Sequence, residues 1–109
     1  MNYRVVFQPQ ALLDLEDQYR YIARDNSLAA DRWFNRFVAA IEAIADSPKR
    51  YSLAREGQLI GREIRQLLFG KRRGVRRVLF LIESDTVRVL CIRHIAQRDM
   101  SADELLGGL

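Results

Sequence analysis

An unbroken apolar run at residues 78–82 (Val-Leu-Phe-Leu-Ile) constrains this chain more than any other feature. It lies within a stretch that reads as three β-strands, at residues 62–69, 75–83 and 86–92. Gly70 and Gly74 flank the first connection, and Ser84 and Asp85 form the second, so both have the composition of hairpin turns. A strand that is apolar at every position has both faces buried. We therefore expect the middle strand to be central in its sheet.

The first half of the chain predicts a short strand and two helices. Residues 3–7 form a β-rich run, which Pro9 ends while also suiting the first turn of a helix over residues 9–24. Asn26 or Ser27 can cap a second helix that continues to about residue 46. Apolar residues recur in both at helical spacing: Leu12, Leu15, Tyr19 and Ile22 in the first, and Ala30, Trp33, Phe37, Ile41 and Ile44 in the second. The short turn between them predicts an antiparallel helical hairpin.

The predicted order of elements is β-α-α-β-β-β, an α+β fold. We expect a mainly antiparallel four-stranded sheet with the helical hairpin packed on one face and a partly open, positive opposite face. A chain of 109 residues fits a single domain, residues 1–109. Residues 49–61 read as a loop, and residues 101–109 as a loosely ordered tail. In that tail Ser101 can cap one helical turn whose Leu105 and Leu106 dock on the body.

Positive charge is concentrated in the sheet half of the molecule. Residues 55–98 hold eleven basic and four acidic residues, a net charge of +7, whereas the whole chain carries +4. Such a field suits an acidic partner, although plain solubility would also account for it. The basic residues lie on strands and turns with no helix-turn-helix pattern, which argues against direct reading of a DNA sequence.

Several classes of function lack the residues that they need. With one cysteine, Cys91, and one histidine, His94, we expect no metal site and no cofactor, and the sequence has no glycine-rich phosphate loop. Cys91 reads as a small core residue of a protein in the reducing cytoplasm. We expect no signal peptide, because the N-terminal MNYRVVF has no basic segment followed by an apolar stretch. We expect no membrane span, because no apolar run approaches the 18–20 or so residues required.

The order of several loose motifs along the chain resembles the RelE/ParE toxins of bacterial type II toxin–antitoxin modules, and the ParE branch more closely. The resemblance runs from Tyr3 to Asp99, and the motifs are the YRVVF strand, Leu15-Glu16, Tyr21-Ile22-Ala23, Asn26, Ala29-Ala30, Ser47-Pro48, Arg62-Glu63-Ile64-Arg65, Arg77-Val78-Leu79-Phe80 and His94-x-x-x-Arg98-Asp99. The chain departs from the family pattern at Arg76, where a tyrosine usually stands. That departure removes an aromatic side chain that could stack on a base and weakens the case for a nuclease.

The resemblance implies a cytoplasmic, growth-inhibiting toxin of a plasmid-stabilisation type of module. ParE-like members inhibit DNA gyrase by binding it and have no known nuclease chemistry, whereas RelE-like members cut mRNA in the ribosome. We expect gyrase inhibition without catalysis. The alternatives are a RelE-like ribosome-dependent endonuclease and a decayed or repurposed family member that binds its partner without toxicity. The implied partner is a cognate antitoxin (ParD-like or other), which forms a hetero-oligomer with the toxin. Operator DNA would be bound only through that antitoxin, and no membrane contact is expected.

Three groups of candidate residues follow from this resemblance. The target-binding group is Arg65, Arg72, Arg73, Arg76, Arg77, Arg93 and Arg98. The antitoxin-binding group is Trp33, Phe34, Phe37, Val38 and Arg77. If the chain is a nuclease, the catalytic group is Arg65, Arg77, His94 and Arg98. Each arginine can instead be a solvated or ion-paired surface residue, and a lone histidine at a strand end is more often structural than catalytic.

Overall fold

A computed structural model describes residues 3–107, except for the side chain of Arg73. Its strands and its two long helices follow the predicted order. The strands are β1 (Arg4–Phe7), β2 (Arg65–Phe69), β3 (Arg76–Glu83) and β4 (Thr86–His94). The helices are α1 (Pro9–Ala23), α2 (Ser27–Glu42), α3 (Gly57–Ile60) and α4 (Ala102–Gly107). Short 3-10 turns lie at Ala43–Asp46, Pro48–Arg50 and Arg72–Gly74. None of the helices within these described residues has the length and apolar character needed to cross a membrane.

The four strands form one sheet in the order β1-β4-β3-β2. β1 runs parallel to β4, and the other two pairs are antiparallel, so the expectation of a mainly antiparallel sheet is confirmed. β1 ends at Phe7, and side chains of α1 then satisfy the exposed edge of β4. The backbone N–H of Ile92 donates to Asp14 (2.9 Å), and Gln18 donates to the Ile92 carbonyl (3.4 Å).

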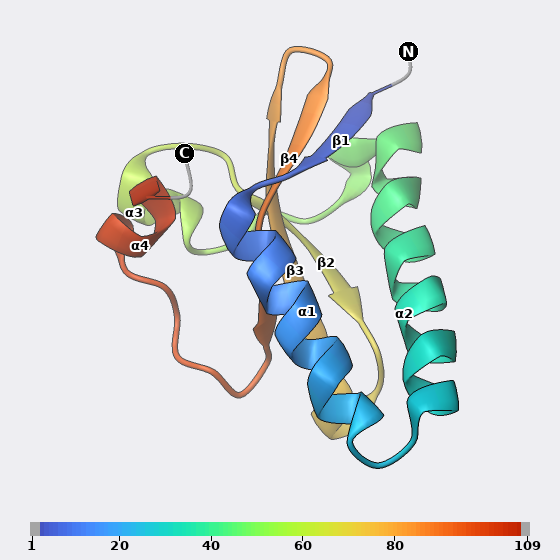
Figure 1. Cartoon of the computed structure of the whole chain (residues 1–109). Helices are drawn as coiled ribbons and strands as arrows, with labels where there is room; N and C mark the ends of the chain where they lie inside the picture. Colours follow the sequence, from blue (N-terminus) through green and yellow to red (C-terminus); the bar gives the residue numbers. More distant parts are fainter. Residues whose placement is uncertain (1–2, 108–109) are drawn as a thin grey trace.

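The helical hairpin of α1 and α2 covers one face of the sheet (Figure 1). Asn26 caps α2, because its side chain accepts a hydrogen bond from the Ala29 N–H (2.9 Å). Four residues of the predicted α2 stripe are buried: Ala30, Phe37, Ile41 and Ile44. The buried face of α1 is rotated about the helix axis relative to the apolar face that the sequence predicts. Its inward residues are Ala11 and Leu15, while Leu12 is 53% exposed and faces the groove between the helices.

The opposite face of the sheet is not open, and this expectation was wrong. Two segments without regular periodicity pack across it, the connection before β2 and the chain after β4 (Figure 1). Their buried residues Ala54, Ile64, Met100 and Leu105 pack with Leu79, Leu81, Leu90 and Cys91 of the sheet. The middle strand is therefore covered on both faces, which is why residues 78–81 are all essentially inaccessible.

Element boundaries differ from the prediction where local hydrogen bonds compete with sheet pairing. β2 begins at Arg65 and not at Arg62, because the Arg62 N–H closes the α3 turn by donating to the Gly57 carbonyl (3.1 Å). The predicted loop before β2 contains α3, and the last turn of the second helix is a 3-10 turn. In α4, Ser101 accepts from the Glu104 N–H (3.2 Å) as an N-cap. Leu105 is buried as expected, whereas Leu106 stays 53% exposed.

Candidate functional site

Arg77 is a buried member of an ion pair, not a cation on an open sheet face. Its guanidinium donates to both carboxylate oxygens of Glu56 (2.7 and 2.8 Å) and twice to the side-chain oxygen of Gln66 (2.8 and 3.1 Å). Arg77 is 5% exposed and Glu56 1% exposed. Burial is the largest influence on the pKa of Glu56 and would raise it, but the hydrogen bonds from Arg77, a backbone hydrogen bond and the charge of Arg77 together outweigh burial, and the pKa is lowered. The expectation that Arg77 presents its charge to a partner was wrong.

The other arginines on this face of the sheet are tied to residues of the chain after β4. Arg55 makes two bonds to Asp99 (2.5 Å each), and Arg98 donates to Glu104 (2.8 Å). Arg93 donates to the carbonyl of Arg98. The hydrogen bond from Arg55 lowers the pKa of Asp99. Asp99 and Glu104 therefore offset part of the positive charge that the sequence places on the sheet half of the molecule.

The four residues of the nuclease alternative are not brought together. Arg65 lies on the helix-covered face and donates to the carbonyls of Lys49 (3.1 Å) and Tyr51 (2.7 Å), while Arg77 lies on the opposite face. His94 is two strands away from Arg65 and about 13 Å further along the sheet, from the strand register. These positions leave no shared site at which Arg65, Arg77 and His94 could act on one phosphodiester.

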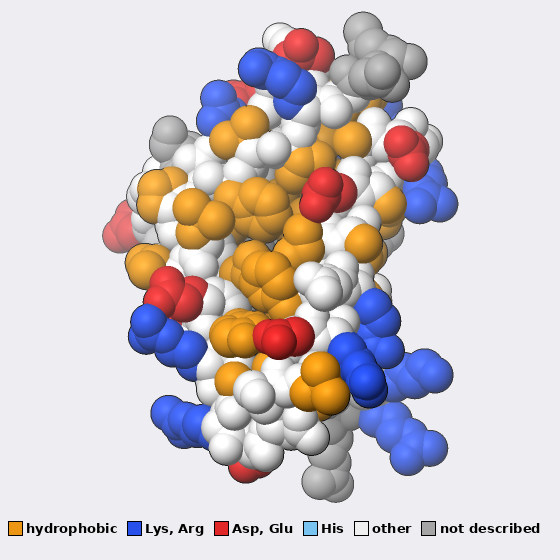
Figure 2. Space-filling model, turned by 45° about the vertical axis from the view of Figure 1, so that its right-hand side comes forward, with side chains coloured by type: hydrophobic (Ala, Val, Ile, Leu, Met, Phe, Trp, Pro, Cys, Tyr) orange, Lys and Arg blue, Asp and Glu red, His pale blue; other side chains and the backbone are white. Residues whose placement is uncertain are grey.

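An apolar groove separates α1 from α2. It has a volume of about 500 Å³ and is lined by Leu12, Leu15, Glu16, Tyr19, Asp31 and Phe34. The Tyr19 hydroxyl donates to Asp31 across the groove (2.5 Å), and this hydrogen bond raises the pKa of Tyr19. On the face that carries the two helices, Figure 2 shows a continuous apolar band with acidic side chains beside it. Such a band on a small protein is typical of an interaction surface.

The structure divides the expected antitoxin-binding residues into accessible and inaccessible ones. Phe34 lines the groove, and Val38 on the same helix is half-buried. Phe37 is completely buried in the core, and Trp33 is half-buried against it, with ring centroids 4.9 Å apart. Phe37 and Arg77 therefore cannot contact a partner in this fold. One sequence could not separate Phe34 from Phe37, because both are aromatic residues on the same amphipathic helix.

β2 is an outer strand of the sheet, and part of its outer edge is covered. The Gln66 N–H donates to the Ser52 carbonyl (3.0 Å), so the preceding segment pairs with the start of the strand. Beyond it, Leu68 is 54% exposed. A second apolar hollow of about 440 Å³ lies beside this strand, lined by Ala40, Ala43, Arg50, Tyr51 and Leu67. A strand added to the outer edge of β2 would therefore lie beside an apolar pocket.

The basic turn between β2 and β3 points away from the core. Lys71 and Arg72 are exposed, and Arg76 is half-buried beside them; the side chain of Arg73 lies outside the described part of the structure. Gly70 makes the turn possible, because its φ is +103° and an added Cβ would lie 2.6 Å from the Gly74 carbonyl oxygen. The turn is therefore built to hold several cations at one end of the sheet.

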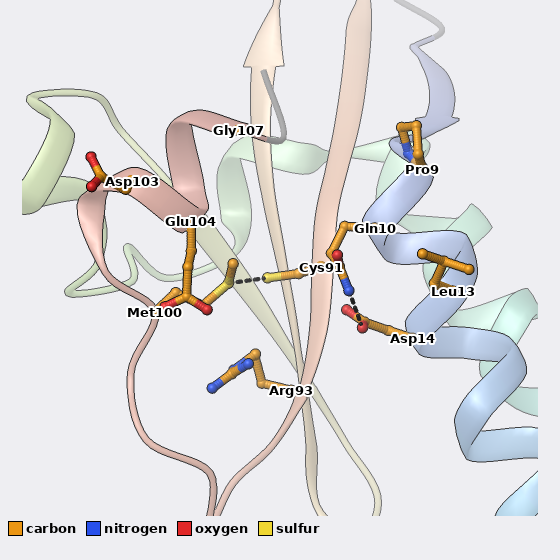
Figure 3. A pocket seen from close by; sticks show the side chains of 10 residues that line it. All are labelled: Pro9, Gln10, Leu13, Asp14, Cys91, Arg93, Met100, Asp103, Glu104 and Gly107. Atoms are coloured by element: carbon orange, nitrogen blue, oxygen red, sulfur yellow. Dashed lines mark hydrogen bonds between the residues drawn. The ribbon is translucent and has the colours of Figure 1, made fainter.

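A further cavity of about 420 Å³ lies where α1, β4 and α4 meet (Figure 3). The Cys91 thiol donates to the Met100 sulfur at its inner end (3.1 Å), and burial raises the pKa of Cys91 to about 12. Such a thiol is protonated at neutral pH and is not a reactive nucleophile. Within residues 3–107, no three His, Cys, Asp or Glu side chains group as a metal site.

Glu104 should titrate far below an ordinary glutamate. Hydrogen bonds from Arg98 and from the Ser101 backbone lower its pKa from 4.5 to about 2. Because the folded pKa is depressed, its contribution to the stability of α4 is present above pH 4.5 and is lost as the pH falls towards 2. Carboxyl-detected NMR titration should give this value, and Arg98→Gln should raise it towards 4.5. An ordinary pKa in the wild-type protein would contradict the arrangement.

Comparison with known proteins gives a consistent result. A family model described as "ParE toxin of type II toxin-antitoxin system, parDE" matches residues 5–99. A solved structure described as "Chromosomal ParDE TA system from P. aeruginosa" has a similar fold, with a TM-score of 0.66 at 16% sequence identity. The alignment covers 85% of this chain and 96% of that one. No curated protein matches the sequence.

Proposed function

Because the chain belongs to the ParE toxin family of type II toxin–antitoxin systems, we propose that it inhibits DNA gyrase by binding it and that a cognate ParD-like antitoxin neutralises it. The observation that carries this proposal is the family match from β1 to Asp99, which spans the elements on both faces of the sheet. A toxin with this target acts in the cytoplasm, and its module can stabilise a plasmid.

Binding without catalysis is supported by the state of the arginines. Arg77 is neutralised by Glu56 inside the protein, and Arg98 is paired with Glu104. Arg65 donates to backbone carbonyls on the other face of the sheet. A metal-free ribonuclease needs a base, an acid and cations around one phosphate, and these side chains do not converge. The proposed gyrase surface consists of Arg72, Arg73, Arg76, Arg93 and Arg98. It omits Arg65, which is bonded to backbone carbonyls, and Arg77, which is buried.

The antitoxin is proposed to dock along the α1–α2 groove. The groove is mostly apolar and is lined by Leu12, Leu15 and Phe34, which suits the apolar side chains of an amphipathic segment. A strand of the same antitoxin can add to the outer edge of β2 near Leu68. Covering both sites requires a segment that wraps around the toxin, and a dimerising antitoxin would then give a hetero-oligomer.

The groove predicts a difference between two neighbouring leucines. Leu12 lines it and Leu13 does not, although the two are similarly exposed on α1 at 53% and 56%. Leu12→Asp should weaken binding to the antitoxin encoded beside the toxin gene about 10- to 100-fold, since burying a leucine contributes roughly 1.5–3 kcal/mol. Leu13→Asp, the matched control, should change the dissociation constant less than threefold. Isothermal titration calorimetry measures both, and equal losses would argue against this groove.

Growth inhibition tests the module as a whole. Induced expression of the chain in a bacterial host should stop growth, and co-expression of the neighbouring antitoxin should restore it. Restoration should be weaker for Leu12→Asp, because a toxin that binds its antitoxin about 10- to 100-fold less tightly is incompletely neutralised. Growth that is unaffected by soluble, folded protein would contradict a toxic role.

A further inference from the structure

Arg76 is held in one place by three different contacts. Its Nε donates to the side-chain oxygen of Gln18 (3.1 Å), and its Nη1 donates to the Gly74 carbonyl (2.6 Å). The guanidinium also lies over the indole ring of Trp33, 5.3 Å from the ring centroid. A guanidinium fixed in this way loses little further conformational freedom when a ligand binds. Nη2 makes no hydrogen bond among the described residues.

Arg76 differs from most other arginines of the chain because it has no acidic partner. Within the described residues, no carboxylate oxygen lies within 4.0 Å of its guanidinium, whereas eight other arginines have such a partner: Arg4, Arg20, Arg55, Arg62, Arg65, Arg77, Arg88 and Arg98. Burial lowers the pKa of Arg76, but an arginine stays charged at neutral pH. A half-buried cation that no carboxylate contacts directly favours the binding of an anion.

The side chain of Arg76 lines a pocket of about 520 Å³ at the end of the sheet. His94, its direct cross-strand partner, lines the same pocket together with Gln18, Tyr21, Gln97 and Asp17. Nδ1 of His94 accepts a hydrogen bond from the Ala96 N–H (3.1 Å), so in the neutral ring Nε2 carries the hydrogen and can donate it. The pocket therefore holds two hydrogen-bond donors for an anion, on Arg76 and His94, beside the carboxylate of Asp17.

The surroundings of the pocket distinguish between kinds of anion. The basic turn with Lys71 and Arg72 precedes Arg76 in the chain, and both residues are exposed. Tyr21 lines the pocket and is 68% exposed, although it is a large aromatic residue on α1. An exposed aromatic ring beside several cations suits a nucleic acid, whose bases stack on the ring while the backbone follows the charges. An acidic protein segment would use the cations but would leave the ring unused.

We propose that this pocket, centred on Arg76 and His94, binds a phosphate group of a nucleic-acid backbone while an adjacent base stacks on Tyr21. The inference rests on the proposed function and deepens it: the toxin would contact the DNA that gyrase holds as well as the enzyme. The contact is a binding contact and involves no cleavage. It is independent of the α1–α2 groove, because neither Arg76 nor His94 lines that groove.

Fluorescence anisotropy with a labelled 20-nucleotide DNA, in the absence of gyrase and antitoxin, tests this site. We expect single-stranded DNA to bind the full chain, with an affinity that falls as salt is raised from 50 to 200 mM. Tyr21→Ala should weaken binding about fivefold or more, and His94→Ala and Arg76→Gln should also weaken it. Tyr21 is exposed, so its variant keeps the test valid even if Arg76→Gln disturbs the packing on Trp33.

Arg4→Gln is the matched control, because Arg4 is an exposed arginine at the opposite end of the sheet, beside Asp85. Its binding should stay within twofold of the wild-type value. The proposal would be overturned by absence of binding at 50 mM salt, by equal losses for Arg4→Gln and Tyr21→Ala, or by a polyglutamate peptide that binds more tightly than DNA. Gyrase inhibition without DNA binding overturns this inference alone, whereas DNA binding without gyrase inhibition overturns the proposed function.

Discussion

Replacing Glu56 by alanine should lower the free energy of unfolding by about 3–5 kcal/mol, because it leaves the charge of Arg77 buried without a partner. Both side chains are almost inaccessible, and two hydrogen bonds of 2.7 and 2.8 Å join them. Urea unfolding followed by circular dichroism measures the change. Glu63→Ala is the control from the same segment: its side chain is 76% exposed, so its loss should cost less than about 1 kcal/mol.

A double variant separates charge burial from a general loss of packing. Glu56→Met combined with Arg77→Met removes both charges and keeps much of the volume, and it should recover most of the stability that Glu56→Ala loses. If the double variant is as unstable as the single one, the pair acts mainly through its shape. A cost below about 1 kcal/mol for Glu56→Ala would show that the carboxylate is not needed to offset Arg77.

Phe37→Ala should have an effect of similar size, about 3–5 kcal/mol, for a different reason. Phe37 is fully buried, and its ring lies between Trp33 and Phe69, with centroid distances of 4.9 and 4.8 Å. Its removal leaves a cavity where α2 packs on the sheet. Leu28→Ala on the same helix is the control, because Leu28 is 58% exposed and should change stability by no more than about 0.5 kcal/mol. A loss below about 1.5 kcal/mol for Phe37→Ala would contradict this packing.

The regular elements could be predicted because hydrophobic periodicity reports directly on them. The apolar run at residues 78–82 marked the central strand, and the α2 stripe marked the buried face of that helix. The covering of the second sheet face could not be predicted in the same way. The segments that cover it have no period, and their buried residues Ala54, Ile64 and Met100 are dispersed along irregular chain.

The roles of charged residues were harder to predict than the fold. Arg77 and Glu56 are 21 positions apart, and nothing local indicates that a loop glutamate meets a strand arginine. The sequence therefore placed Arg77 on an open face, whereas Arg77 is paired with Glu56 and its neighbour Arg76 has no ion pair among the described residues. Strand alternation puts the two on opposite faces, but only the three-dimensional structure shows which face each occupies.

An assay of purified DNA gyrase with and without this protein tests the proposed inhibition. Supercoiling of relaxed plasmid and trapped DNA cleavage complexes are scored together, with the antitoxin complex as the neutralised control. We predict that the protein inhibits supercoiling, that cleavage complexes accumulate, and that the antitoxin abolishes both effects. Gyrase inhibition would be contradicted if supercoiling is unchanged and no complexes are trapped at a several-fold molar excess of folded protein. Ribosome-dependent mRNA cleavage would then be the next activity to test, with His94→Ala as the first variant.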